Sequence, residues 1–127
     1  MLEKMKSKKI LLIDDDDGIH KAMDIIFGKV CHYTIISALS EKEGLIALIN
    51  NSDVGAILCD YKMNGYEFTK EIRTNPGYLR YSQIPIIGID FPETEREFLT
   101  KHMQKPLDYK VLVNDMEEIF GGLKSES

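Results

Sequence analysis

Residues 10–18 read ILLIDDDDG, four consecutive apolar residues followed by four aspartates and a glycine. The apolar run does not alternate with polar residues, which is typical of a strand buried on both faces of a parallel sheet. Three further apolar runs follow along the chain: YTII at 33–36, VGAILC at 54–59 and IPIIGI at 84–89. Each is far enough from the previous run to leave room for a crossover helix.

Helical patterns separate these runs. Apolar residues on one helical face recur at 19, 22, 23, 26 and 27, then at 45, 48 and 49, at 68 and 72, and at 112, 116, 119 and 120. Ser40 with Glu43 forms a capping-box signature before the second pattern. Before the last pattern, Asp108 is a candidate cap, and Gly121–Gly122 is the expected stop. Strands that alternate with helices predict an α/β fold, a three-layer doubly wound parallel sheet with right-handed crossovers.

The fifth strand of this sheet is expected near residues 100–104, where TKHMQ is a weak strand sequence. The 127 residues then form one domain, with a core over about 8–121, a basic N-terminal extension at 1–8 and a C-terminal tail at 121–127. Cys31 and Cys59 lie in apolar stretches without metal-type spacing, so we expect reduced core thiols.

Composition excludes several classes of protein. The longest uninterrupted apolar run, 10–13, is far shorter than the roughly 20 residues of a membrane span. It is also too short for the core of a signal peptide, which together with the reduced cysteines predicts a cytoplasmic protein. The net charge of −5 argues against a nucleic-acid-binding surface.

Charged residues follow the ends of the predicted strands. The four aspartates of 14–17 follow the first strand, Asp60 follows the third, Asp90 the fourth and Lys105 the fifth. Ligands bind at the carboxyl edge of such a sheet, so these side chains are expected to converge. Crowded carboxylates repel one another, and Mg²⁺, which prefers oxygen ligands, relieves that repulsion. The set Asp14, Asp15, Asp60 and Lys105 therefore predicts a phosphoryl-transfer site with Asp60 as the nucleophile.

The same residues resemble the receiver domain of two-component response regulators over about 8–121. KKILLIDDDDGIH is similar to the first strand and acidic pair of that family, and VGAILCDYKMNGYEFTKEIR to its third strand, phosphoacceptor and following helix. IPIIGID resembles the fourth strand and QKPLD the lysine-proline turn. The resemblance implies a flavodoxin-like strand order 2-1-3-4-5.

The resemblance also implies a role for each matching residue. Asp14 and Asp15 match the acidic pair that holds Mg²⁺, and Asp60 matches the phosphorylated aspartate, itself a metal ligand. Lys62 would give its backbone carbonyl to the metal, while its side chain tunes dephosphorylation. Lys105 would pair with the phosphoryl group, and its bond to Pro106 would be cis. The implied partner is a histidine kinase or phosphotransfer protein, a homodimer is allowed, and the domain would not act as an enzyme on external substrates.

Three positions depart from the family pattern. Asp90 stands where the family has Ser or Thr, and an ionised carboxylate there can only accept hydrogen bonds. His102 stands at the switch position that is usually Tyr or Phe, and it adds a titratable ring. Only 15 positions separate Asp90 from Lys105, which predicts a shortened fourth helix within PETEREFL, with Pro92 at its first position. We therefore expect phosphorylation of Asp60 with atypical switching.

Two other functions remain open at the level of sequence. The domain could be a degenerate, phosphorylation-independent interaction module, because a fold does not fix a function. Residues 15–18, DDDG, also resemble the nucleophile loop of haloacid dehalogenase-type phosphohydrolases, although 127 residues leave little room for the rest of such an enzyme. An EF-hand loop is excluded, because aligning Gly18 with its glycine puts Ile13 at the first ligand position.

Overall fold

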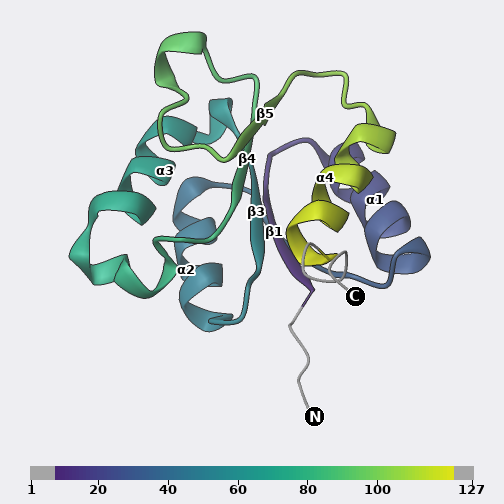
Figure 1. Cartoon of the computed structure of the whole chain (residues 1–127), viewed down its shortest axis with the longest axis horizontal. Coiled ribbons are helices and arrows are strands. Elements are labelled where there is room, and N and C mark those ends of the chain that lie inside the picture. Colours follow the sequence, from purple (N-terminus) through teal and green to yellow (C-terminus); the bar gives the residue numbers. More distant parts are fainter. Residues whose placement is uncertain (1–7, 122–127) are drawn as a thin grey trace.

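The computed structural model describes residues 8–121, which form a five-stranded parallel sheet with helices on both faces (Figure 1). The strand order is β2-β1-β3-β4-β5, as the resemblance implied. The strands are β1 (Lys9–Ile13), β2 (Thr34–Ala38), β3 (Ala56–Asp60), β4 (Ile86–Ile89) and β5 (Lys101–Met103). The weak fifth strand is therefore confirmed. Because all strands are parallel, their carboxyl ends meet at one edge of the sheet.

Burial explains the non-alternating sequence of the central strands. In β3 and β4 every residue is buried, and in β1 only Lys9 is not fully covered. β2 and β5 are the edge strands, and they are partly exposed. A strand that packs against helices on both faces has no solvent side to hold polar residues. The three apolar runs that match β1, β3 and β4 were therefore the clearest signals in the sequence.

Two helical layers cover the sheet. In Figure 1 the first and last helices lie on one side of the sheet, and the two middle helices lie on the other. The helices are α1 (Asp17–Met23), continued by the π-helix η2 (Asp24–Val30), then α2 (Glu41–Asn50), α3 (Gly65–Thr74) and α4 (Tyr109–Gly121). Short 3-10 turns complete the chain: η3 (Tyr61–Met63), η4 (Pro76–Tyr81) and η5 (Glu93–Glu95).

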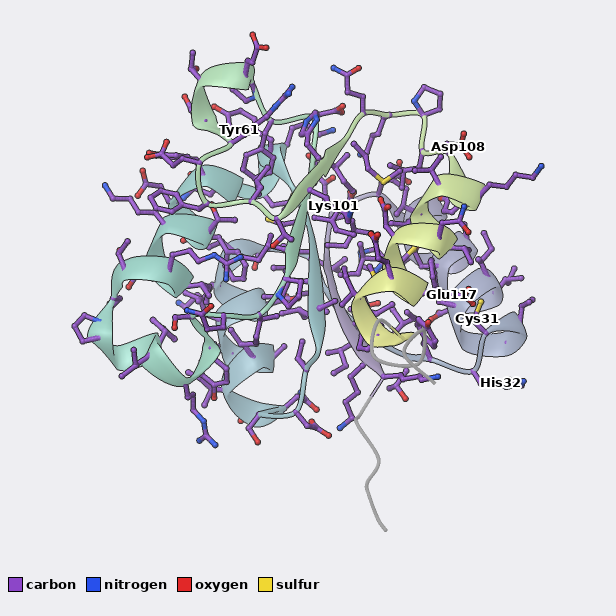
Figure 2. The ribbon with its side chains drawn as sticks, viewed as in Figure 1. Cys31, His32, Tyr61, Lys101, Asp108 and Glu117 are labelled. Carbon is purple, nitrogen blue, oxygen red and sulfur yellow. The ribbon has the colours of Figure 1, made fainter. Side chains whose placement is uncertain are left out.

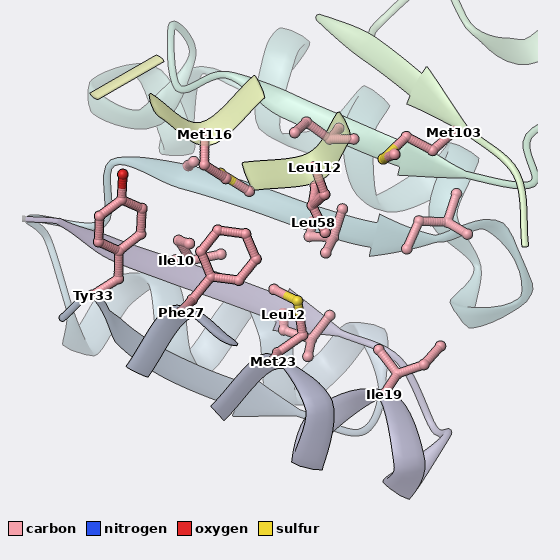
Figure 3. Close-up of a cluster of buried hydrophobic side chains, with 13 residues drawn as sticks. Ile10, Leu12, Ile19, Met23, Phe27, Tyr33, Leu58, Met103, Leu112 and Met116 are labelled. Atoms are coloured by element: carbon pink, nitrogen blue, oxygen red, sulfur yellow. The ribbon is translucent and has the colours of Figure 1, made fainter. Parts of the chain in front are cut away.

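Each helical layer buries its own apolar cluster against the sheet. Figure 3 shows the cluster under α1 and α4, in which Met23 and Phe27 face Leu12, Leu58 and the side chains of the last helix. The cluster on the opposite face lies under α2 and α3 and includes Phe68 and Ile72, the pair that sequence spacing placed on one helical face. Burial of this apolar surface is the main favourable contribution to the fold.

Helix caps follow the sequence signals closely. Ser40 Oγ accepts the amide hydrogen of Glu43 at 3.1 Å, while Glu43 Oε1 accepts from the amide of Leu39 at 2.9 Å. The reciprocal bond of the capping box thus reaches one residue further back than the usual pattern. Asp108 Oδ1 accepts from the amides of Lys110 and Val111 and caps α4. The helix includes Gly121, and the rest of the expected glycine stop and tail lies outside the described residues.

Two elements differ from the sequence-based expectation. The first helical pattern continues as a π-helix after Met23, which the i, i+3, i+4 spacing of apolar residues could not distinguish from an α-helix. The fourth helix is reduced to the single turn η5, and Pro92 lies just before this turn instead of at its first position. Leu99 packs against Gly88, where an added Cβ would lie 2.5 Å from Leu99 Cδ1. The chain therefore turns back toward β5 too early for a longer helix.

Within residues 8–121, none of the helices combines the length and the hydrophobicity needed to cross a bilayer. Cys59 is buried, Cys31 is half-buried, and both are free thiols. The expectation of core thiols therefore holds fully for Cys59 and only partly for Cys31. Figure 2 shows Cys31 and His32 at the lower end of the helix that begins with α1, away from the edge of the sheet near Tyr61.

Candidate phosphoacceptor site

Two buried acids and one lysine meet at the carboxyl edge of the sheet. Asp14 follows β1 directly, Asp60 is the last residue of β3, and Lys105 lies two residues beyond β5. Lys105 Nζ is 2.8 Å from Asp60 Oδ2 and 3.3 Å from Asp14 Oδ2, and both carboxylates are fully buried. Their positions after parallel strands predicted that these three side chains converge, and the structure brings them together.

The carboxylate of Asp60 is held at both oxygens. Oδ1 accepts the amide hydrogen of Lys62 at 2.9 Å, and Oδ2 accepts from Lys105 Nζ. Burial pushes the pKa of Asp60 upward, but the hydrogen bonds from Lys105 and Lys62 and the charge of Lys105 outweigh it, so the pKa lies below its usual value. For Lys105, burial acts in the other direction and lowers the pKa. The hydrogen bond to Asp60 and the charge of Asp14 outweigh it, so the pKa of Lys105 lies above its usual value. Asp60 is therefore kept ionised.

Asp14 differs from Asp60 in having one oxygen without a hydrogen bond. Its Oδ1 accepts from the amide of Asp16 at 2.9 Å, whereas Oδ2 is buried and has no hydrogen-bond partner among the described residues. Burial raises the pKa of Asp14, and the neighbouring charge of Asp60 adds to this effect. The counter-charge nearest to Oδ2 is Lys105 Nζ at 3.3 Å, and Asp60 holds the same ammonium more closely at 2.8 Å. Two buried carboxylates thus share one positive charge, which marks Oδ2 as an atom that an additional cation would stabilise.

These donor atoms fit a magnesium ion better than a structural transition metal. Within residues 8–121, no three His, Cys, Asp or Glu side chains are grouped closely enough to form a complete metal cage. Mg²⁺ does not need such a cage, because it commonly binds through one or two carboxylates and keeps several waters. Asp14 Oδ2, which has no hydrogen bond within the described residues and lies beside Asp60, offers that kind of partial oxygen site.

The run of four aspartates divides into four different environments. Asp14 is buried in the site, and Asp15 is exposed and lines a cavity beside it. Asp16 caps α1 by accepting hydrogen bonds from the amides of residues 18 and 19. Asp17 pairs with Lys21 at 3.1 Å on the helix surface, so it is not oriented as the second acid of a dehalogenase-type loop.

Asp90, the first departure from the family pattern, is bonded to the backbone that carries Lys105. Its backbone is in the left-handed region at φ 61°, and its exposed side chain accepts the amide hydrogen of Lys105 at 3.0 Å through Oδ1. Asp90 therefore connects the end of β4 to the backbone that carries the lysine of the site.

His102 is bonded to the backbone of the same connection. It lies in β5, and its Nε2 accepts the amide hydrogen of Phe91 at 3.0 Å, so this nitrogen carries no proton. Burial, followed by the charge of Arg96, lowers the pKa of His102 below its usual value, although Asp90 acts in the opposite direction. Both switch positions thus stabilise the backbone between β4 and β5.

The remaining predicted positions surround the acceptor. Lys62 is exposed, and its amide, rather than its side chain, contacts Asp60. The Lys105–Pro106 peptide bond is cis, in agreement with the sequence-based expectation. The functional roles assigned to these residues and to Asp15 stay predictions.

An open cavity of about 860 Å³ lies beside the acceptor, next to the start of α3. Its wall includes Asp15, Lys62 and Glu95, and Tyr61 donates a hydrogen bond to Glu95 at 3.0 Å across it. Phe91, which follows the end of β4, packs edge-on against the Tyr61 ring at 5.3 Å between centroids. The short η5 turn, which contains Glu95, is therefore bonded directly to the segment that follows Asp60.

No protein-family model matches the sequence, and no curated protein matches it. Solved structures match over most of its length. The receiver domain of Francisella response regulator 1452 has a TM-score of 0.74 at 22% identity, covering 92% of this chain and 99% of that chain. Chemotaxis protein CheY4 of Vibrio cholerae gives 0.73 at 20% identity, covering 89% and 98%.

A signal receiver domain from Bermanella marisrubri gives a TM-score of 0.75 at 20% identity, covering 89% of this chain and 98% of that chain. The strand order and the flanking helices described above match the CheY-like fold of these structures. The chain has the fold of a response regulator receiver domain. In this fold Asp60 is the last residue of β3, at the carboxyl edge of the sheet.

Two polar contacts, one behind Asp14 and one at the opposite end of α3, involve side chains that were not singled out from the sequence. His20 is buried on α1 and bonds to the carbonyl of Asp14 at 2.6 Å. Arg73 on α3 donates to the carbonyls of Ser82, Ile84 and Phe98 and so connects three segments of backbone. Each is the last residue of a stretch quoted above for its resemblance, but no spacing signal indicates its contacts, because the fold alone brings its partners close.

Proposed function

We propose that this chain is a phosphoacceptor receiver domain of a two-component system, phosphorylated on Asp60 in a reaction that depends on Mg²⁺. The observation that supports this most directly is the buried, ionised carboxylate of Asp60 bonded to Lys105 Nζ at 2.8 Å and placed beside Asp14. The proposed donor is the phosphohistidine of a histidine kinase or phosphotransfer protein.

In the proposed reaction, a carboxylate oxygen of Asp60 attacks the phosphorus of the donor. A P–O bond forms while the P–N bond breaks, and the donor imidazole leaves with the bonding electron pair and takes up a proton. Lys105 orients the nucleophile before attack and then pairs with the transferred group, whose negative charge its ammonium stabilises. Asp14, Asp15, Asp60 and the Lys62 carbonyl are the groups that would hold Mg²⁺, which neutralises the charge of the phosphoryl oxygens.

The domain modifies itself and releases no external product, so its output is a shift between conformations that a partner recognises. We infer a cytoplasmic location, where histidine kinases deliver their phosphoryl groups, and a homodimer is compatible with this role. The residues at the two switch positions are already bonded to backbone amides, which supports atypical switching.

The test is the covalent adduct itself. The wild-type protein is incubated with acetyl phosphate and Mg²⁺ and analysed by intact mass, followed by peptide mapping. We expect one phosphoryl group on Asp60, none in the Asp60→Asn variant, and normal uptake in Asp24→Asn, which removes an exposed carboxylate at the start of η2. Absence of an adduct on the wild-type protein would reject the proposal.

A second candidate function is a phosphorylation-independent interaction module. It is favoured by Asp90, which offers no hydroxyl to a phosphoryl group and instead accepts from the Lys105 amide. If this candidate is correct, the Asp60→Asn variant binds its partner and signals as the wild type does. A receiver that switches on phosphorylation would lose its response in that variant.

A further inference from the structure

His20 is a buried histidine whose two ring nitrogens are both engaged. Its Nε2 lies 2.6 Å from the carbonyl oxygen of Asp14, and its Nδ1 lies 2.8 Å from Ser37 Oγ. A carbonyl oxygen can only accept, so Nε2 carries the proton and donates it to Asp14. His20, which is 7% exposed, therefore connects the residue after β1 to strand β2 from the α1 side of the sheet.

The other polar atoms of Asp14 are also fixed, with one exception. Its amide donates to the carbonyl of Ala38 at 3.2 Å, and its Oδ1 accepts from the amide of Asp16. Oδ2 alone has no hydrogen-bond partner within the described part of the chain, and it lies 3.3 Å from Lys105 Nζ. The scaffold thus holds Asp14 at three points and leaves a single oxygen directed at the site.

His20 supplies the one side-chain contact to the main chain of Asp14 that the structure shows. Without it the peptide after Asp14 could rotate, and Oδ2 would move relative to Asp60 and Lys105. Displacements of about 1 Å are enough to weaken a site that depends on oriented groups. Removing a group that hydrogen-bonds to a metal ligand, and so orients it, typically lowers metal affinity by about 10–100-fold.

We propose that His20 is a positioning residue of the phosphoacceptor site, which directs Asp14 Oδ2 toward the cation by holding the Asp14 carbonyl. This inference rests on the proposed receiver function. The alternative is that His20 only fills the core and satisfies two buried polar groups, in which case its loss would lower stability without a separate effect on the site.

Two substitutions of similar size separate these roles. In His20→Gln the amide nitrogen stands near the position of Nε2, so it can still donate to the Asp14 carbonyl. In His20→Asn the shorter amide reaches only the region of Nδ1. It can therefore still bond to Ser37 Oγ, but the hydrogen bond to the Asp14 carbonyl is lost. Both variants lose the ring and its packing, so they are matched controls for stability.

The experiment is a Mg²⁺ titration of the full chain followed by the ¹H–¹⁵N resonances of Asp16 and Lys62, with thermal melting measured without Mg²⁺. We expect His20→Gln to bind Mg²⁺ within about threefold of the wild type and His20→Asn to bind at least about 10-fold more weakly. Phosphoryl uptake from acetyl phosphate should follow the same order. Equal affinity in the two variants, or losses that merely parallel the melting temperatures, would overturn the proposal.

The metal-free spectra separate this proposal from the receiver function itself. Both variants lose the ring current of the imidazole, so the informative quantity is the difference between them: the amide of Asp16, which donates to Asp14 Oδ1, should stay closer to its wild-type chemical shift in His20→Gln than in His20→Asn. If the wild type bound no Mg²⁺ and took up no phosphoryl group, the receiver function would fail, and this amide shift alone would decide the role of His20. The same shift in both variants would reject the positioning role.

Discussion

Replacement of Lys105 by methionine tests the electrostatic arrangement of the site. Methionine keeps most of the apolar stem of the side chain but removes the ammonium that lies between Asp14 and Asp60. Two fully buried carboxylates would then face each other without a counter-charge. Their repulsion and the lost hydrogen bond to Asp60 both act against the folded state.

The expected magnitude follows from the burial of the three groups. Removing one partner of a fully buried ion pair costs about 3–5 kcal/mol, because the remaining charge is left uncompensated. The Lys105 side chain is 23% exposed, so water can solvate part of the site after the substitution. We therefore expect Lys105→Met to lower the free energy of unfolding by about 2–4 kcal/mol at pH 7 in the absence of Mg²⁺.

The measurement is urea unfolding with and without Mg²⁺. Lys110→Met is the matched control, since Lys110 is exposed and its loss should change stability by no more than about 0.5 kcal/mol. Mg²⁺ should stabilise Lys105→Met more than the wild type, because a cation replaces the missing ammonium. Equal stability of the two variants, without an added effect of Mg²⁺, would refute the account of Asp14 and Asp60 as a pair that shares Lys105.

Three further predictions concern the framework of the site. Gly65→Ala should cost about 1–3 kcal/mol in urea unfolding, because the added Cβ would lie 2.7 Å from Phe91 Cζ and 2.9 Å from the Asp60 carbonyl oxygen. Gly28→Ala, whose Cβ meets nothing closer than 3.9 Å, should not be destabilising. Arg73→Met should cost about 2–3 kcal/mol, since three backbone carbonyls lose a charged donor, whereas removal of the exposed Lys70 should be nearly neutral. His102 has a folded-state pKa below its unfolded value, so its stabilising contribution is present above about pH 6.5 and is lost as the pH falls through the folded pKa. Between pH 7.5 and about 5.5, the free energy of unfolding of the wild type should therefore decrease more than that of His102→Gln. An equal decrease in both proteins would show that the unprotonated His102 ring does not stabilise the fold.

The central sheet was predictable because burial on both faces leaves a direct mark on the sequence. Every residue of β3 before Asp60, and every residue of β4, is buried and is apolar or glycine. This pattern can be recognised in each strand separately, before its neighbours in the sheet are known. The order of acids and lysine at the strand ends then indicated a shared edge. Their convergence was predictable because parallel strands end on the same side of a sheet.

The connection between β4 and β5 was only partly predictable. The short separation of Asp90 and Lys105 correctly indicated a reduced fourth helix, but not that a single 3-10 turn would remain. The reason lies in tertiary contacts. The packing of Leu99 on Gly88 and the bond from Arg96 Nε to the Phe91 carbonyl fix the path of the chain, and neither has a sequence signature.

The same limit applies to the orientation of polar side chains. The identity of Asp90 showed that it could only accept hydrogen bonds, but its acceptance from the Lys105 amide depends on a left-handed backbone at φ 61°. Likewise, the contact of His20 with Asp14 requires α1 to pack across the end of β1. Sequence reasoning identifies the chemical groups, whereas the folded backbone decides which of them meet.

The hydrogen bond from the Lys105 amide to Asp90 joins the two ends of the segment 90–105 and makes it a closed ring. This ring includes η5 and the whole of β5, and it carries the site lysine at one of its ends. β5 is held in the sheet by β4, so a movement of Lys105 toward an incoming anion would pass through this bond to Asp90 and the segment that carries η5. Under the proposed function, a partner bound over η5 would then detect a change at Asp60 without reaching the buried carboxylate.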